Sequence, residues 1–256
     1  MHISSKSIKY LGDERMTHQF DKAVLAYESK DYNEAYGLFK TIADENPNAM
    51  VNLAMMHMKG TGCERDNGIA FSLFEKAAKK GNNNALNSLA IFYEKGIHGD
   101  SNPEKALEYY TKAADIGNIN AQLKAGMLFR QKGDIKQSMR YLITAAHNNN
   151  EQAQEIITFV SNASIATERN NEFRLLTYEQ QSSLIENLIK TKIKPTLEAD
   201  NGGIELINYI DGEKPQIWLN YLGACSGCHL GSTSTADMLL DHFETMIDKN
   251  VVLYLM

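Results

Sequence analysis

The chain has 256 residues, of which 43% are hydrophobic and 23% are charged. This balance is that of an ordinary globular protein and excludes both wholesale disorder and a helical membrane bundle. A formal net charge of −6 argues against the broad basic surface on which sequence-independent nucleic-acid binding depends. At roughly 100–200 residues per domain, the length predicts two domains, or a repeat array followed by a small module.

The first 19 residues form a polar segment without the apolar run of roughly 7–15 residues that a secretory signal contains. No stretch of about 20 consecutive apolar residues, the length that crosses a bilayer as a helix, occurs elsewhere in the sequence. We therefore expect a cytoplasmic protein with no membrane partner.

One motif occurs three times between residues 48 and 122. An Asn-Ala pair stands at 48–49, 84–85 and 120–121, so that successive copies are 36 residues apart. Each pair leads into apolar residues at helical spacing, and a second helical pattern follows at 70–78, 106–114 and 138–146. The third unit is four residues shorter, and we assign this deletion to the loop between its helices. A copy of the second pattern at 31–39 brings the prediction to about four helix pairs.

Stacked helix pairs share a continuous core and curve into a solenoid with a concave side. The Gly60-Thr61-Gly62 loop and the Lys-Ala-Ala tripeptides at 76–78 and 112–114, each with glycine three residues later, resemble SEL-one-like repeats, relatives of the tetratricopeptide class. The resemblance covers roughly residues 20–150, and a closing helix over 151–160 extends the predicted array to 20–160. It implies a scaffold that binds other proteins and has no enzymatic activity.

A polar segment at 161–177 is predicted to link the array to a second domain over 178–256. Its sequence predicts a helix over 178–192 with a kink or restart at Pro195, strands over 204–210 and 216–222, a helix over 235–247 and a strand over 251–255. We expect Trp218 to pack on the second of these helices. The predicted fold class is therefore multi-domain: an all-α helical-repeat solenoid, then a small α+β domain in the order helix-strand-strand-helix-strand.

Two of the three cysteines, Cys225 and Cys228, stand three residues apart in a glycine-rich segment between the second strand and the second helix. Cysteines at this spacing can direct both sulfurs to one point, and a helix N-terminus nearby favours the thiolate. Thiolates bind soft metals and iron–sulfur clusters. Cys63 lies in a repeat loop with no partner at such a spacing, and we interpret it as an ordinary loop thiol.

The surrounding motifs resemble the NifU C-terminal, or Nfu-type, domain over residues 178–256. They are Ile193-Lys194-Pro195-Thr196-Leu197, Asp200-Asn201-Gly202-Gly203 and Gly223-Ala224-Cys225-Ser226-Gly227-Cys228. The resemblance implies a module that assembles or carries iron–sulfur clusters and transfers them to recipient apoproteins, with Cys225 and Cys228 as the iron-binding residues. Ile204 and His229 depart from the family pattern.

A four-iron, four-sulfur cluster takes four thiolates, and this domain offers two. We therefore expect a homodimer that shares one cluster between two protomers.

Other interpretations of the pair stay open. The segment from Cys225 to His229 also has the C-x-x-C-H pattern of c-type haem attachment, in which His229 would bind iron. Strand, C-x-x-C and helix is likewise the order of a thioredoxin-like dithiol, but no proline follows Pro215 to face the pair. Four thiolates from two subunits would equally hold a structural zinc ion. A structural zinc domain, or an inert domain that has lost cluster binding, would leave a protein-binding adaptor. No Ser/His/Asp or paired-carboxylate pattern stands at a catalytic spacing, and we expect no enzymatic activity.

Overall fold

The structure is a computed structural model of the full chain, and it describes residues 5–161, 171–198, 202–222 and 233–256. The chain divides into two compact units, Met1–Ala125 and Gly126–Met256. In the described ranges, no helix combines the length and the apolar character that spanning a membrane demands.

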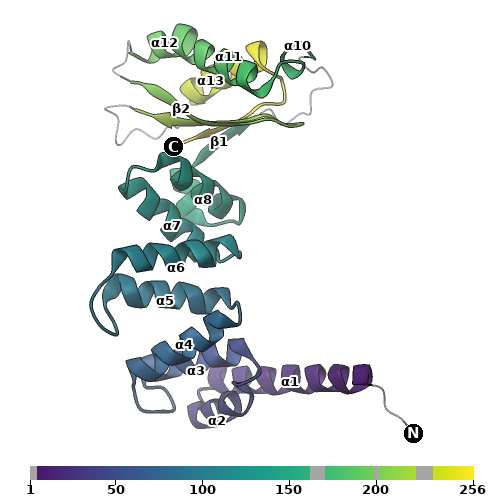
Figure 1. Cartoon of the computed structure of the whole chain (residues 1–256), viewed down its shortest axis with the longest axis vertical. Coiled ribbons are helices and arrows are strands. Elements are labelled where there is room, and N and C mark those ends of the chain that lie inside the picture. Colours follow the sequence, from purple (N-terminus) through teal and green to yellow (C-terminus); the bar gives the residue numbers. More distant parts are fainter. Residues whose placement is uncertain (1–4, 162–170, 199–201, 223–232) are drawn as a thin grey trace. The chain divides into compact units, whose positions relative to one another are not determined.

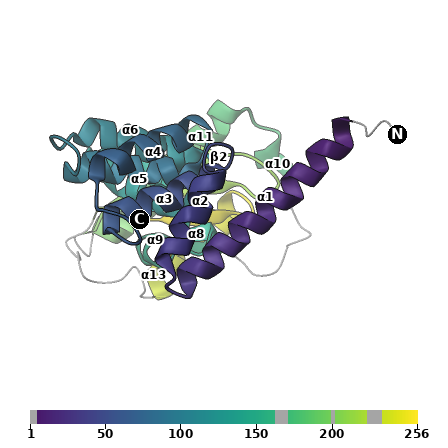
Figure 2. The ribbon, with the colours of Figure 1, turned by 90° about the horizontal axis from the view of Figure 1, so that it is seen from below.

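The first unit is entirely helical in the part that the structure describes (Figure 1). Its helices are α1 (Ser5–Glu28), α2 (Tyr32–Ile42), α3 (Pro47–Lys59), α4 (Asn67–Lys79), α5 (Asn83–Lys95), α6 (Pro103–Asp115) and the first half of α7 (Ile119–Gln131). The predicted helices at 31–39, 70–78 and 106–114 are confirmed as α2, α4 and α6. The sequence did not predict α1, which covers most of the segment expected to be merely polar and lies alongside α2 (Figure 2).

Side-chain caps and small buried residues explain why these helices form and pack closely. Asn46, Asp66, Asn82 and Asn102 each accept a hydrogen bond from a backbone N–H in the first turn of the following helix. Fully buried alanines and larger side chains together form the core between the helices, and alanine's small side chain allows helices to pack closely. These residues are Ala35, Ala70, Ala77, Ala85, Ala106, Ala113, Phe39, Phe74 and Tyr110.

The recurring asparagines also join one repeat to the next. The Asn82 side-chain amide donates to Asn48 Oδ1 at 2.7 Å, and the Asn118 amide donates to Asn84 Oδ1 at 2.9 Å. The oxygen of each donating amide caps its own helix at the same time. The asparagines of the first two Asn-Ala copies, Asn48 and Asn84, therefore accept from the helix-capping asparagine of the next helix pair, and both halves of each capping amide are hydrogen-bonded.

The second unit combines the end of the array with a small sheet domain. Its further elements are α8 (Ile135–His147), α9 (Glu151–Ile156), β1 (Thr158–Ser161), α10 (Asn171–Arg174), α11 (Tyr178–Leu188), the π-helical turn η1 (Ile189–Ile193), α12 (Lys194–Glu198), β2 (Ile204–Ile210), β3 (Gln216–Tyr221), α13 (Thr233–Met246) and β4 (Val252–Leu255). The strand order is β1-β4-β3-β2, with β3 and β4 parallel and the other two pairs antiparallel. The fold is therefore a helical-repeat solenoid followed by a small α+β domain.

The helices α11, α12 and α13 pack on one face of this sheet (Figure 1). Fully buried side chains from both layers meet there, among them Ile185, Ile193, Ile217, Leu239 and Phe243. The predicted kink before Pro195 is confirmed as the π-helical turn η1. A proline in a regular helix clashes with the carbonyl four residues earlier, and a wider turn at this point relieves that clash.

Three differences from the sequence predictions concern the ends of the array and the sheet. The helix expected over 151–160 ends at Ile156, and residues 158–161 pair with β4 as β1. Thr158-Phe159-Val160 has the composition of a strand rather than of a helix. The expectation that Trp218 packs on the second helix is wrong, because strand alternation directs Ile217 and Leu219 to the helices and Trp218 to the opposite face.

Candidate functional site

The predicted ligands Cys225 and Cys228, together with His229, lie outside the described residues. The structure describes both flanks of their segment. On one side, β3 ends at Tyr221, whose N–H donates to Met256 O at 2.9 Å, while the Leu222 N–H donates to Gly203 O at 2.7 Å. On the other side, α13 begins at Thr233. The cysteine pair is therefore carried between a hydrogen-bonded strand end and a helix start, as the sequence predicted.

The double glycine that precedes β2 packs against the strand end that leads to the cysteines. A Cβ atom added to Gly202 would lie 2.3 Å from the Tyr221 hydroxyl and 3.2 Å from Leu197 O, and one added to Gly203 would lie 3.2 Å from Leu222 O. Because a real Cβ atom would need its neighbours to move, glycine at both positions allows this close approach. Two motifs about 20 residues apart in sequence thus meet at the base of the cysteine segment.

A pocket of about 540 Å³ lies between the α11–α12 helical segment and β2. Its floor is apolar, with Ile189, Pro195 and Leu206, and its rim carries the charges of Lys190, Lys194 and three glutamates, Glu186, Glu198 and Glu205. Carboxylates and ammonium groups are poor ligands for the soft metals that thiolates bind. In the part of the chain that the structure describes, no three His, Cys, Asp or Glu side chains converge on a point that would hold a metal ion.

Cys63 lies in the loop before α4 of the first unit, where its Sγ lies 3.8 Å from Thr61 O. Burial raises the pKa of this thiol, so the neutral form is favoured at neutral pH. A protonated, partly buried thiol is a weaker ligand than a thiolate. This environment agrees with the interpretation of Cys63 as an ordinary loop thiol.

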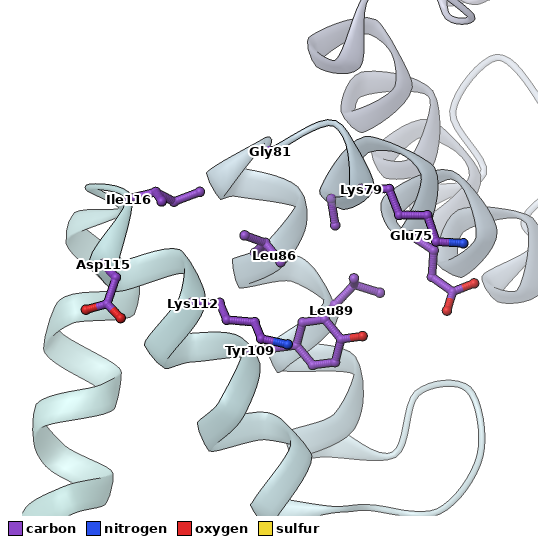
Figure 3. Close-up of a pocket in the computed structure, with 10 residues that line it drawn as sticks. Glu75, Lys79, Gly81, Leu86, Leu89, Tyr109, Lys112, Asp115 and Ile116 are labelled. Atoms are coloured by element: carbon purple, nitrogen blue, oxygen red, sulfur yellow. The ribbon is translucent and has the colours of Figure 1, made fainter.

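The array carries a second candidate site, an open pocket of about 560 Å³ between α4, α5 and α6 (Figure 3). Leu86 and Leu89 form its apolar floor, and Figure 3 shows the side chains of Tyr109 and Lys112 lying side by side over it. Lys112 makes an ion pair of 2.6 Å with Glu108, and burial raises the pKa of Tyr109, which stays a neutral phenol. The pocket joins an apolar floor to a charged rim, a combination suited to a side chain of another protein.

Sequence reasoning missed two residues that hold the sheet domain together, Arg174 and Asp248. Arg174 Nε donates to Asp248 Oδ2 at 2.8 Å, and its other nitrogens donate to the carbonyls of Gly212 and Glu213. Asp248 is fully buried. Arg174 belongs to the 161–177 segment, where no periodic pattern signalled structure.

These observations define a class of protein: an array of helical repeats joined to a small α+β domain that carries a cysteine pair between a strand and a helix. Comparison with protein families makes the assignment specific. Residues 185–251 match the NifU-like domain, and residues 47–82, 83–118 and 119–150 each match the Sel1 repeat. The chain thus contains three Sel1 repeats and a NifU-like domain, as both resemblances implied.

A solved structure supports the assignment of the repeats. A Sel1 repeat protein from Oxalobacter formigenes has 26% sequence identity to this chain and a TM-score of 0.52, over 55% of this chain and 61% of that protein. The protein c5321 of uropathogenic Escherichia coli, a protective antigen with an SLR fold, is also 26% identical, with a TM-score of 0.45 over 49% of this chain and 28% of that one. The chain thus matches less than two thirds of the length of either relative. No curated protein sequence matches it.

Proposed function

We propose that the protein is a carrier or scaffold for iron–sulfur clusters, which its NifU-like domain holds through Cys225 and Cys228 and transfers to recipient apoproteins. The observation that carries this proposal is that both cysteines fall inside the NifU-like match at 185–251. The cluster is the cargo of this activity and leaves with the recipient. The protein itself catalyses no reaction in this proposal.

The donor chemistry fits the cargo. Two thiolates per chain at i and i+3 make half of the ligand set of a four-iron, four-sulfur cluster, so two protomers hold one cluster between them. We also propose that the protein is cytoplasmic.

The Sel1 repeats supply the partner-binding half of the function. Repeat arrays present extended surfaces to other proteins, and the pocket between α4, α5 and α6 offers one apolar anchor point with a charged rim. Holding a recipient or a cluster-assembly protein on the array raises the effective concentration of the cluster donor near it. The partners are therefore proteins, with no role for nucleic acid or membrane.

The first test is the ultraviolet–visible spectrum of the full chain purified without oxygen, with iron, zinc and acid-labile sulfide assayed on the same sample. We expect broad visible absorption, with iron and sulfide in equal amounts and about two of each per chain. Cys225→Ser and Cys228→Ser should each abolish the absorption, because each removes half of the ligands of that protomer. Cys63→Ser is the matched control and should leave spectrum and iron content unchanged. Sedimentation should show a dimer while the cluster is bound.

The other outcomes identify other functions. Sharp haem bands that survive denaturation would replace the cluster with haem attached at Cys225, Cys228 and His229. Zinc without sulfide would leave the alternative of a protein-binding adaptor with a structural metal. In that case Cys225→Ser and Cys228→Ser would destabilise the domain without affecting a cluster.

A further inference from the structure

The short helix α9 begins as a fourth repeat would begin. Asn150 caps α9 by accepting a hydrogen bond from Ala153 N at 2.9 Å, and Gln154 Nε2 donates to Ala146 O at 3.0 Å. The third repeat has the same two bonds 32 residues earlier: Asn118 accepts from Ala121 N at 2.9 Å, and Gln122 Nε2 donates to Ala114 O at 3.3 Å. Ala153 and Ala121 are both fully buried. The repeat geometry therefore continues one step beyond the third matched repeat.

The fourth repeat stops after this first turn and a half. The α9 helix ends at Ile156, and the chain enters β1 at Thr158 to pair with β4. In the complete repeats, by contrast, the first helix runs for 13 residues and is followed by a second helix of 13. The surface of α8 that a further helix pair would cover has to be covered by something else, because an array end with an apolar face is unstable.

The second face of the NifU-like sheet covers it. Tyr254 of β4 makes a hydrogen bond of 3.2 Å with His147 Nε2 of α8, and the Ser138 hydroxyl of α8 lies 3.8 Å from Met256 Sδ. Trp218 lies edge-on to Tyr254 on the same face, with ring centroids 6.4 Å apart. These contacts lie within the second compact unit, where Figure 1 shows α8 on the side of the sheet away from α11 and α13.

The burial of these side chains agrees with a packed contact. Ser138 is 0% exposed, Tyr254 4%, and Trp218 and Met256 7% each. A sheet face that carried tryptophan, tyrosine and methionine into water would be an aggregation hazard. Each surface therefore requires burial. The last repeat helix, α8, lacks a following repeat to cover it, and the sheet has helices on only one of its faces.

We infer that the NifU-like sheet is the C-terminal cap of the Sel1 array: its second face takes the place of the missing remainder of the fourth repeat on α8 and α9. β1 connects the two directly, since it continues from α9 and is the edge strand beside β4. The stability of the last repeat helix and that of the cluster-carrying domain are therefore coupled. This inference does not depend on the cargo that the cysteines bind.

Hydrogen–deuterium exchange of the full chain tests the coupling. Tyr254→Phe removes only the hydroxyl that bonds His147, and we expect amides of α8 and α9, residues 135–156, to exchange about two- to tenfold faster. Met256→Ala removes a buried side chain from the contact and should have a larger effect on the same amides. Both substitutions lie in the sheet domain, so faster exchange in the helices would be transmitted through the contact.

Two control variants make the result specific. Tyr110→Phe removes an equivalent buried hydroxyl, which donates to Glu94 at 2.7 Å within the first unit, and should speed exchange in α5 and α6 while leaving 135–156 unchanged. Met256→Leu keeps the volume of the side chain and should preserve the native rates. If residues 135–156 exchange at the native rate in both Tyr254→Phe and Met256→Ala, the sheet does not cap the array, whether or not the sheet itself loosens.

Discussion

Arg174 links three parts of the sheet domain that lie far apart in the sequence. It joins α10 to the β2–β3 hairpin and to the fully buried Asp248 carboxylate that precedes β4. A buried carboxylate that loses its partner keeps its desolvation penalty without compensation. The contact bridges 74 residues, and no local pattern could have predicted it.

Arg174→Ala should therefore lower the free energy of unfolding of the sheet domain by about 3 kcal/mol. Lys112→Ala provides the comparison, because it removes an ion pair of similar length whose two side chains are more than half exposed, and it should cost less than about 1 kcal/mol. Urea titrations, followed by Trp218 fluorescence for the first variant and by circular dichroism for the second, measure both. Equal losses of unfolding free energy in the two variants would show that the burial of Asp248 does not increase the contribution of its ion pair with Arg174.

The cysteine pair could be recognised from the sequence alone, but the role of the nearby double glycine could not. Their spacing and flanking glycines identified the pair from sequence, and the described flanks place the segment between β3 and α13 as expected. The role of the double glycine as a contact for Tyr221 and Leu222 required the structure, because sequence shows that glycine is present but not what approaches it.

At the level of elements, the junction between repeats makes a prediction of its own. Asn118 caps α7 and also donates to Asn84 of the preceding repeat, and it is buried. Asn102 caps α6 in the same way, through a bond to Lys105 N. Asn118→Ala should cost about 2 kcal/mol, because cap and junction are both lost, and Asn102→Ala about 1 kcal/mol.

Thermal unfolding by circular dichroism distinguishes the two losses. Asn102→Ala removes a helix cap without a junction. The difference in stability between the two variants therefore measures the contribution of the junction. The junction hypothesis fails if both variants melt at the same temperature.

Helices that recur in the 36-residue repeat, and elements with a clear helical or strand spacing of apolar residues, were predicted to within a few residues. Elements without such a pattern were missed. The 36-residue repeat located α3 to α8, and the shorter third unit correctly indicated a shorter loop, 132–134 instead of 96–102. β1 has only four residues, and its partner β4 lies more than 90 residues further along the chain. Nothing local distinguishes such a strand from the end of a helix.

At the scale of the whole molecule, the two halves of the proposed function should be separable by substitution. In the proposed function the array binds the recipient and the NifU-like domain holds the cluster, so a change in the pocket between α4, α5 and α6 should affect cluster transfer without affecting cluster binding. Ile116 lines this pocket and is 49% exposed. Its exposure makes it a position where a charge alters the surface with little effect on folding.

Ile116→Asp in the full chain should keep the visible spectrum and the iron content of the native protein. It should slow cluster transfer to an apoprotein that takes a four-iron cluster by about five- to tenfold at limiting concentration, because a carboxylate replaces an apolar contact. Ile69→Asp makes the same change at a residue of α4 that is 45% exposed and does not line the pocket, and it should transfer at the native rate. Loss of transfer in both variants would indicate a general effect of charge. Native transfer by Ile116→Asp would remove this pocket from the recipient-binding surface and leave the cluster-carrying domain as the part that recognises the recipient.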